Sequence, residues 1–251
     1  MINILLSGAG GKMGNAVINS VSSAEKFKII CGVDKKSDIS DYDFQVFDSF
    51  DNVTLTPDII IDFSSPYMLD GLLQFAKKKK IPAVIATTGF SDEQISEIKS
   101  ASADIPIFFT FNLSLGINLL KILCRKAAEI LGDDFDIEII EKHHNQKIDA
   151  PSGTALMLAD SINNISDNKY NYEFDRHSRR MKRPKNEIGI HSLRGGTIVG
   201  EHEVVFAGTD EVITLSHEAY SKGIFANGAL KAAEFLVDKK PGLYNMEDIF
   251  K

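Results

Sequence analysis

Residue types that donate protons and bind anions are concentrated between Glu141 and Ala155. Two adjacent histidines, His143 and His144, are followed by Lys147 and then by a Pro-Ser-Gly-Thr sequence that opens an apolar-periodic run. A histidine or lysine whose pKa lies near the working pH can donate a proton in a transition state. Lys147 could equally act as a fixed cation that holds a carboxylate. The stretch therefore predicts acid catalysis beside an anion site, with His143 and Lys147 as the candidate catalytic residues.

The sequence after these residues predicts the start of a helix. Pro151 prevents a helix from running through this point and favours extended backbone at the residue before it. A helix beginning near Ser152 would direct its free N–H groups and its positive dipole end toward the His/Lys cluster. Donors from Ser152, Gly153 and Thr154 would then suit a small carboxylate. A solvated loop with a helix cap is the alternative, but a proton donor, a cation and an anion-binding helix start in one short stretch favour a site.

A glycine-rich turn near the amino terminus has the context of a dinucleotide-binding loop. The first strand ends at Ser7 and leads through Gly8, Gly11 and Gly14 into an amphipathic helix. The strict G-x-G-x-x-G spacing is not met, because its sixth position is Met13, and a glycine loop alone could be only a tight turn. The strand before it and the helix after it supply the context of a nucleotide-binding fold.

The second strand, predicted over residues 27–33, ends at an acidic residue followed by two lysines. Asp34 is placed to bind the ribose hydroxyls of adenosine. Lys35 and Lys36 could meet the 2′-phosphate of NADPH, although solvated surface lysines are an equal alternative. Both NADH and NADPH therefore remain candidate cofactors.

Further strands are predicted at residues 58–63, 81–87 and 105–111, with helices between them. The capping pattern Ser91-Asp92-Glu93-Gln94 predicts the start of one of these helices. This alternation of strands and helices predicts an α/β fold with a doubly wound, Rossmann-like parallel sheet. Ligands of such sheets bind beyond the carboxyl ends of the strands. The residues predicted to bind the cofactor are Gly8, Ala9, Gly10, Gly11, Lys12, Met13, Asp34, Lys35, Ala86, Thr87, Thr88, Thr110, Phe111, Asn112 and Leu113.

The character of the chain changes after Asn112. A long helix at 115–131 and an alternating strand at 135–140 precede the candidate catalytic stretch, and short alternating runs follow at 197–199, 203–206 and 211–215. These runs predict a second α+β domain with a mixed or antiparallel sheet. The polar, basic segment 167–187 could be a mobile surface segment or part of the site, and we favour the surface segment. A last helix at 224–237 is expected to pack on the first domain. We expect residues 1–113 and 224–251 to bind the dinucleotide, and residues 114–223 to bind substrate and form the oligomer.

Composition argues against several classes of protein. The net charge of −7 disfavours nucleic acid as a partner, and no segment has the apolar length of a membrane span. Met1 leads directly into a strand-like run, so export is not expected and a cytoplasmic location is predicted. Cys31 and Cys124 are interpreted as buried, reduced thiols. We expect no metal site, because no Cys-x-x-Cys or His-Glu-x-x-His spacing occurs.

The candidate catalytic stretch has the form E-x-H-H-x-x-K-x-D-A-P-S-G-T-A. In this form it closely resembles the signature of the dihydrodipicolinate reductase family, also called 4-hydroxy-tetrahydrodipicolinate reductases. Residues 189–202 alone would suggest a Gly-bounded hairpin. Within them, residues 191–202 resemble the family's H-S-x-R-x-G-x-x-x-G-x-H segment, and residues 225–229 resemble its closing helix. The resemblance therefore covers nearly the whole chain.

This resemblance implies an NAD(P)H-dependent reductase of diaminopimelate and lysine biosynthesis. Its substrate would be 4-hydroxy-tetrahydrodipicolinate, a cyclic dicarboxylate, and its products tetrahydrodipicolinate and water. By position, His143 resembles the family's catalytic histidine and Lys147 its proton-donating lysine, while His144, Gly153 and Thr154 match substrate-binding positions. The family also implies a homotetramer built through the sheet of the second domain.

One departure from the family pattern is Ala86, where glycine is more usual before Thr-Thr. An extra methyl group there could shift the nicotinamide side of the cofactor.

Two other functions are also compatible with the sequence. One is a related two-domain amino-acid or sugar dehydrogenase, and the other is a non-catalytic, dinucleotide-sensing regulator.

Overall fold

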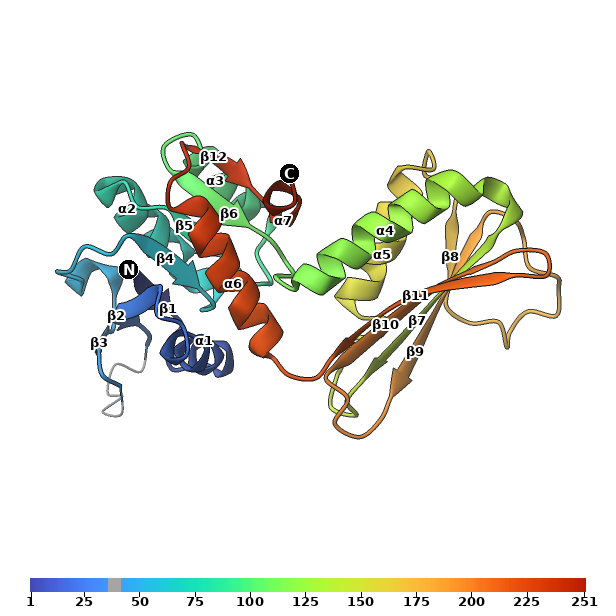
Figure 1. Ribbon diagram of the computed structural model, residues 1–251, viewed down its shortest axis with the longest axis horizontal. Helices are drawn as coiled ribbons and strands as arrows, with labels where there is room; N and C mark the ends of the chain where they lie inside the picture. The colour runs from blue at the N-terminus through green and yellow to red at the C-terminus, as the bar shows by residue number, and fades with distance from the viewer. Residues whose placement is uncertain (36–41) are drawn as a thin grey trace. The chain divides into compact units, whose positions relative to one another are not determined.

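The computed structural model describes residues 1–35 and 42–251, and these divide into two compact units (Figure 1). The first unit contains Met1–Ser114 and Lys222–Lys251, and the second contains Leu115–Ser221. The chain therefore leaves the first unit once and returns to it at Lys222.

The first unit is built on a seven-stranded sheet in the order β12-β6-β5-β4-β1-β2-β3. Its strands are β1 (Ile2–Ser7), β2 (Phe27–Val33), β3 (Gln45–Phe47), β4 (Ile59–Asp62), β5 (Ala83–Ile85), β6 (Pro106–Phe109) and β12 (Gly242–Tyr244). Every neighbouring pair is parallel, so the carboxyl ends of all seven strands lie at one edge. The predicted doubly wound parallel sheet is confirmed.

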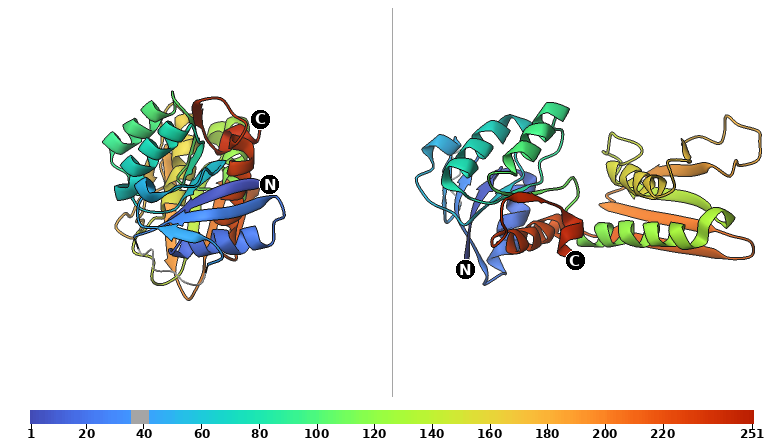
Figure 2. Two further views of the ribbon diagram at one scale, coloured as in Figure 1. Left: turned by 90° about the vertical axis from the view of Figure 1, so that its left-hand side faces the viewer. Right: turned by 90° about the horizontal axis from the view of Figure 1, so that it is seen from above.

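Helices cover both faces of this sheet (Figure 2). The main ones are α1 (Lys12–Ser22), α2 (Leu69–Lys79), α3 (Asp92–Ala101) and α6 (Gly223–Leu236), with short turns η1 (Phe50–Asn52), η2 (Pro66–Met68) and α7 (Met246–Ile249). The central strands β1 and β4 are almost continuously apolar because both of their faces are buried. The predicted helix start at Ser91 is confirmed by a capping box, in which Ser91 and Gln94 bond each other's backbone amides.

The second unit contains a mixed five-stranded sheet in the order β11-β10-β7-β9-β8. Its strands are β7 (Asp136–His143), β8 (Asn171–Glu173), β9 (Glu187–Arg194), β10 (Gly200–Ala207) and β11 (Val212–Ala219), and its helices are α4 (Leu115–Leu131), η3 (Gly132–Asp134) and α5 (Gly153–Asn164). Strand β9 is parallel to β7, whereas β10 is antiparallel to it. The predicted second, mixed sheet is therefore confirmed.

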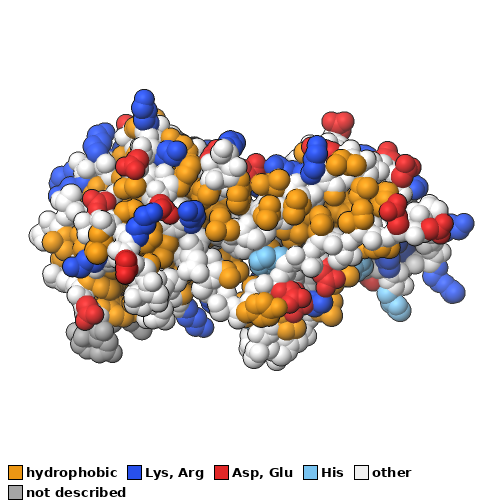
Figure 3. Space-filling view, in the orientation of Figure 1, with side chains coloured by type: hydrophobic (Ala, Val, Ile, Leu, Met, Phe, Trp, Pro, Cys, Tyr) orange, Lys and Arg blue, Asp and Glu red, His pale blue; other side chains and the backbone are white. Residues whose placement is uncertain are grey.

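Helices α4 and α5 pack on the same face of this sheet (Figure 1). Alternation along β7 places Ile137 and Ile139 in the core beneath them, while Asp136 and Glu138 lie on the opposite face. Figure 3 shows hydrophobic side chains at the surface along α4, where Leu119 is 49% exposed. Helix α4 therefore buries one side and leaves apolar surface on the other. No helix in the described ranges 1–35 and 42–251 is long and apolar enough to cross a membrane.

Two predictions for the second unit were wrong in detail. Residues 197–199 are not a strand but belong to the connection between β9 and β10, which turns at Gly196 with a φ of +49°. Residues 189–202 do not form a hairpin, because β9 and β10 lie on opposite sides of β7. Alternation of apolar and polar residues predicts strands in this region, but it does not show that β7 lies between β9 and β10.

The basic segment 167–187 also differs from the mobile surface segment that its composition suggested. It contributes the edge strand β8, which pairs in parallel with β9. Arg183 donates to the carboxylates of Asp136 and Glu138 at 2.9 and 3.0 Å. These ion pairs attach the segment to the exposed face of the sheet.

Candidate functional site

The candidate catalytic histidine lies at the end of β7 beside a buried carboxylate. Because side chains alternate along a strand, Glu141 and His143 point to the same face, which is the one covered by the helices. Glu141 is completely buried, and its Oε2 lies 2.6 Å from Nδ1 of His143. Its Oε1 accepts a hydrogen bond from the backbone amide of Ser152 at 3.1 Å.

Arg194 completes this cluster from the end of β9. It is paired in register with His143, and its guanidinium donates to both oxygens of Glu141 at 2.8 and 2.7 Å. It also donates to the backbone carbonyl of Asp149 at 2.6 Å. Such a two-point contact fixes the guanidinium in orientation as well as position.

The two titratable groups of this cluster are shifted in their acidity. Burial opposes ionisation of Glu141, but hydrogen bonds from Arg194, Ser192 and His143 outweigh it and lower the carboxyl pKa to about 2. Burial lowers the pKa of His143 below its usual value, while Glu141 opposes that shift. Glu141 is therefore ionised near neutral pH, and it favours the charged form of the histidine.

Lys147 and His144 lie in the turn that follows β7. The backbone amide of Lys147 donates to the carbonyl of His144, and its ammonium lies 2.8 Å from Oδ1 of Asp149. That hydrogen bond lowers the pKa of the Asp149 carboxyl. An ion pair with so exposed a carboxylate contributes only about 0–1 kcal/mol, so an anionic ligand can replace it.

The predicted helix start is confirmed at α5. Ser152 is its N-cap, and its hydroxyl accepts from the amide of Ala155 at 3.2 Å. The same hydroxyl lies 3.0 Å from Nε2 of His202, whose pKa burial lowers to about 3. Ser152 is itself buried, so its polar groups bond within the protein, and Gly153 and Thr154 form the first turn behind it.

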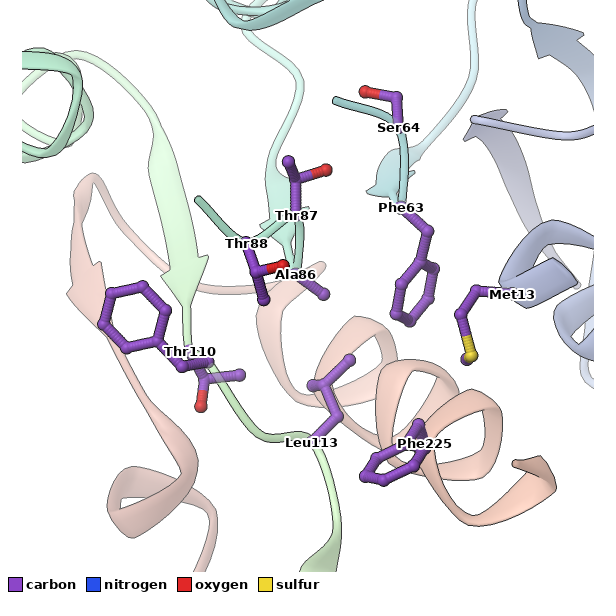
Figure 4. Close-up of a pocket in the computed structure, with 10 residues that line it drawn as sticks. Met13, Phe63, Ser64, Ala86, Thr87, Thr88, Thr110, Leu113 and Phe225 are labelled. Atoms are coloured by element: carbon purple, nitrogen blue, oxygen red, sulfur yellow. The ribbon is translucent and has the colours of Figure 1, made fainter. Parts of the chain in front are cut away.

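The first unit has a pocket of about 280 Å³ beyond the carboxyl ends of its strands (Figure 4). Figure 4 shows Phe63 and Met13 side by side, with Leu113 and Phe225 below them. The lining residues are Met13, Phe63, Ser64, Ala86, Thr87, Thr88, Thr110, Phe111, Leu113 and Phe225. A largely apolar pocket with a few hydroxyl groups suits a flat, polar ring.

A buried carboxylate supports this pocket. Asp62 is the last residue of β4, and it accepts hydrogen bonds from the hydroxyls of Ser64 at 2.6 Å and Thr87 at 2.7 Å. Burial raises the pKa of this carboxyl above its usual value, although the hydroxyl groups oppose the shift. Asp62 thereby joins two loops that line the pocket.

A second pocket of about 200 Å³ lies along the glycine loop and is lined by Gly8, Gly11, Asp34 and Lys35, among others. Gly8 has a φ of +80°, and a Cβ there would lie 2.6 Å from the carbonyl oxygen of Phe63. Asp34 accepts a hydrogen bond from the amide of Gly10 at 2.9 Å. The loop is therefore held close to the strand ends, as approach to a pyrophosphate requires.

Comparison with known proteins gives one family for both units. Residues 2–113 match the family model for the amino-terminal part of dihydrodipicolinate reductase, and residues 116–250 match the model for its carboxyl-terminal part. The chain belongs to the dihydrodipicolinate reductase family. Members of this family are NAD(P)H-dependent oxidoreductases, so the chain is an enzyme of that class, and the expectation drawn from the sequence is confirmed.

Individual relatives agree over the full length of the chain. The 4-hydroxy-tetrahydrodipicolinate reductase of Caldanaerobacter subterraneus subsp. tengcongensis is 50% identical, with 100% of this chain and 99% of the relative covered. The enzyme of Clostridium novyi is 45% identical with the same coverage. A solved structure of dipicolinate-bound dihydrodipicolinate reductase from Paenisporosarcina sp. TG-14 has a TM-score of 0.82 and 26% identity, and it covers 99% of each chain.

The structure brings together most of the reductase residues predicted to contact the cofactor. Eleven of the fifteen line one of the two pockets, and the other four are Ala9, Gly10, Lys12 and Asn112. Asn112 instead accepts from the amide of Ser114 through its side chain. Lys36, considered with Lys35, lies outside the described residues.

Sequence reasoning missed several residues of these sites. In the first unit they include Phe63 and Ser64, which follow β4 just as the predicted residues follow the other strands. In the second unit they are Glu141 and Arg194. The period of two would have placed Glu141 beside His143, whereas nothing local placed Arg194 there.

The described residues contain no group of three or more His, Cys, Asp or Glu side chains that could hold a metal ion. Cys31 and Cys124 are both free and buried, as expected. Burial raises the pKa of Cys31 to about 11 and that of Cys124 to about 12, so neither thiol is reactive.

Proposed function

We propose that the chain reduces 4-hydroxy-tetrahydrodipicolinate to tetrahydrodipicolinate and water with NADH or NADPH, as a step of diaminopimelate and lysine biosynthesis. The observation on which this rests is that His143, Arg194 and Lys147 lie together beside the start of α5. Cations and a helix start suit a small dicarboxylate, and the histidine and lysine can supply a proton. The names of the full-length relatives support the same substrate.

We assign the first unit to the dinucleotide and the second to the substrate. Gly8, Gly11 and Asp34 would hold the adenosine and pyrophosphate side of the cofactor, and Ala86–Thr88 with Thr110–Leu113 its nicotinamide side. When bound, the cofactor supplies a hydride. A Cβ at Gly14 would lie 2.3 Å from the carbonyl oxygen of Gly8, so this loop has the close backbone packing that a dinucleotide needs.

The protein's part in the proposed reaction is to bind carboxylates and to move a proton. Lys147, His144 and the first turn of α5 at Gly153 and Thr154 would hold a substrate carboxylate. Ser152, whose amide and hydroxyl already bond within the protein, would position that helix start. His143 would hold a proton at Nε2, because its Nδ1 already bonds Glu141. Lys147 is the other candidate donor, and separate variants distinguish the two.

The test is to follow loss of reduced-nicotinamide absorbance in the presence of enzymatically generated substrate. We expect turnover that depends on both substrate and cofactor, and competition by dipicolinate, which is bound in the Paenisporosarcina structure. Turnover of amino acids or sugars in its place would favour a related dehydrogenase. Cofactor binding without any turnover would favour a sensing protein.

We further propose a homotetramer formed through the face of the second sheet that α4 and α5 do not cover. This face carries the linked ion pairs of Lys142 with Glu201 and Glu203 at 2.9 and 3.0 Å, and the exposed Val212 near its edge. Light scattering that gives the mass of a single chain at working concentration would contradict this arrangement. A cytoplasmic location fits the use of a reduced nicotinamide and the two reduced cysteines.

A further inference from the structure

Glu141 joins three segments of the second unit through one carboxylate. Its Oε2 contacts Nδ1 of His143 on β7 at 2.6 Å and Nη1 of Arg194 on β9 at 2.8 Å. Its Oε1 contacts Nη2 of Arg194 at 2.7 Å and the amide of Ser152, the N-cap of α5, at 3.1 Å. Ser192 on β9 is a further donor to this carboxylate. A carboxylate has about four acceptor positions, so these contacts leave none of them unused.

We propose that Glu141 is a positioning residue for the reaction, which fixes one tautomer of His143 and holds Arg194 and the start of α5 around it. This inference rests on the proposed function, because it acts through the histidine assigned there to proton transfer. Glu141 itself is completely buried and does not need to touch the substrate.

The tautomer follows from the chemistry of the contact. An ionised carboxylate only accepts hydrogen bonds, so Nδ1 of His143 must carry the hydrogen. The neutral ring then has a bare Nε2, and the charged ring has its transferable proton there. A Cβ at residue 200 would lie 3.1 Å from Nε2, so Gly200 leaves space beside that nitrogen.

Among the described residues, four groups with charge or the capacity to ionise face His143. They are Glu141 on its own strand, Arg194 on β9, His202 on β10 and Lys147 in the following turn. The ring centroids of His143 and His202 lie 5.2 Å apart, and burial keeps His202 neutral near pH 7 by lowering its pKa to about 3. Burial and the two cations disfavour the charged form of His143, and Glu141 is the group of the four that favours it.

The decisive variant is Glu141→Gln, which keeps the shape and removes the charge. Loss of the charge removes the group that raises the pKa of His143, so the pKa should fall further and the protonated fraction at neutral pH should decrease. We therefore expect kcat at pH 7 to fall at least about tenfold. The limb of the pH–activity profile in which kcat declines with rising pH should move to lower pH. Glu141→Asp keeps the charge, so it should retain the position of that limb even where kcat is lower.

Glu138→Gln is the matched control. Glu138 lies on the same strand but on the opposite face, and it also bonds an arginine and a histidine, Arg183 at 3.0 Å and His191 at 2.8 Å. This variant removes an equivalent set of contacts without touching His143. Its pH limb should therefore coincide with that of the wild type.

Nitrogen NMR of the histidine rings reads the tautomer without any turnover. We expect the Nδ1–H form of His143 in the wild type and in Glu138→Gln, and a mixture of forms in Glu141→Gln. An Nε2–H tautomer in the wild type would overturn the proposal even if Glu141→Gln failed to fold. An unchanged pH limb in Glu141→Gln, or an equal shift in Glu138→Gln, would also overturn it. Failure of the wild type to reduce the substrate would instead contradict the proposed function and leave the NMR result standing.

Discussion

A buried carboxylate lies under the candidate site of each unit, but the two have opposite surroundings. Asp62, at the end of β4, is bonded by the hydroxyls of Ser64 and Thr87, and burial raises its pKa. Glu141, in β7, is bonded by Arg194 and His143, and its pKa falls to about 2 despite burial. The same chemical group is thus made a weaker acid in one unit and a stronger acid in the other.

The difference matches the role proposed for each unit. Neutral hydroxyls around Asp62 fix the loops of a pocket without placing a cation in it, which suits a ligand held mainly through backbone and apolar contacts. The ionised Glu141 lies among cations, where it can orient them and influence the proton on His143. Variants of the second unit should therefore lose mainly kcat, whereas variants of the first unit should mainly raise KM for the cofactor.

The largest expected effect is on proton transfer in the second unit. His143→Ala or Lys147→Ala should lower kcat by about 10²–10⁴-fold, the usual scale of general acid catalysis. Binding of NADH, measured by fluorescence titration, should change little because both residues belong to the second unit. As a counterpart, Thr87→Val removes a partner of Asp62 and should raise KM for NADH more than it lowers kcat. Near-wild-type turnover in both His143→Ala and Lys147→Ala would exclude these residues from the mechanism.

The two carboxylates should also differ in their effect on stability. The folded-state pKa of Glu141 lies below its ordinary value of 4.5, so its contribution is present above pH 4.5 and is lost as pH falls toward 2. Asp62 has a raised folded-state pKa, so the stability linked to it is present below 3.8 and is lost as pH rises.

Urea unfolding from acidic to neutral pH tests this contrast. Glu141→Gln should lower the free energy of unfolding at neutral pH by on the order of 3 kcal/mol, because it leaves Arg194 partly unpaired. Asp62→Asn keeps a partner for both hydroxyls and removes a buried charge, so it should cost less than about 1.5 kcal/mol. Equal losses of unfolding free energy in the two variants would show that the two carboxylates do not differ in their contribution to stability.

The first unit could be predicted closely from the sequence because its signals are local. The boundaries of β2 agree with the prediction, and the strand at 58–63 and the helix start at Ser91 were each marked by a buried apolar run or a capping pattern. The short edge strands β3 and β12 escaped prediction. Each has only three residues, and such strands exist because a neighbouring strand is already present.

In the second unit the local elements were predictable, but their pairing was not. The bounds of α4 and the N-cap of α5 agree with the prediction. The contact of Arg194 with Glu141 joins residues 53 positions apart, and it exists only because β9 runs parallel to β7. Since alternation shows which face a side chain takes but not which strand lies next to it, this part of the site was visible only in the structure.

A smaller effect is expected at the start of α5. Thr154→Val keeps the shape of the side chain and removes its hydroxyl, so KM for the substrate should rise more than kcat falls. Loss of a hydrogen bond to a charged group should cost roughly 1.5–3 kcal/mol. Steady-state kinetics with dipicolinate as inhibitor checks the same site, because its affinity should fall in parallel. Competition of dipicolinate with the cofactor instead of the substrate would place the carboxylate site in the other unit.

The smallest effect concerns the choice between NADH and NADPH. Asp34 lines the pocket beside the glycine loop, where we expect it to favour ribose hydroxyls and to repel a 2′-phosphate. The ammonium of Lys35 lies 5.3 Å from the ring centroid of Tyr67, close enough to the same pocket to attract that phosphate. Exposed charge pairs contribute only about 0–1 kcal/mol each, so neither residue should dominate.

We therefore expect both cofactors to be used, with a preference of at most about tenfold, which corresponds to roughly 1.4 kcal/mol. The preference for NADPH relative to NADH should fall as the salt concentration is raised, because the attraction between its 2′-phosphate and the lysines is exposed to solvent. Replacing Lys35 and Lys36 by alanine should raise KM for NADPH and leave NADH almost unchanged. Replacing the exposed Lys78 and Lys79 in the last turn of α2 by alanine removes the same charge and serves as the control. A wild-type preference of about a thousandfold, or equal weakening of both cofactors in the double variant, would mean that the first unit selects its cofactor by contacts other than these exposed charges.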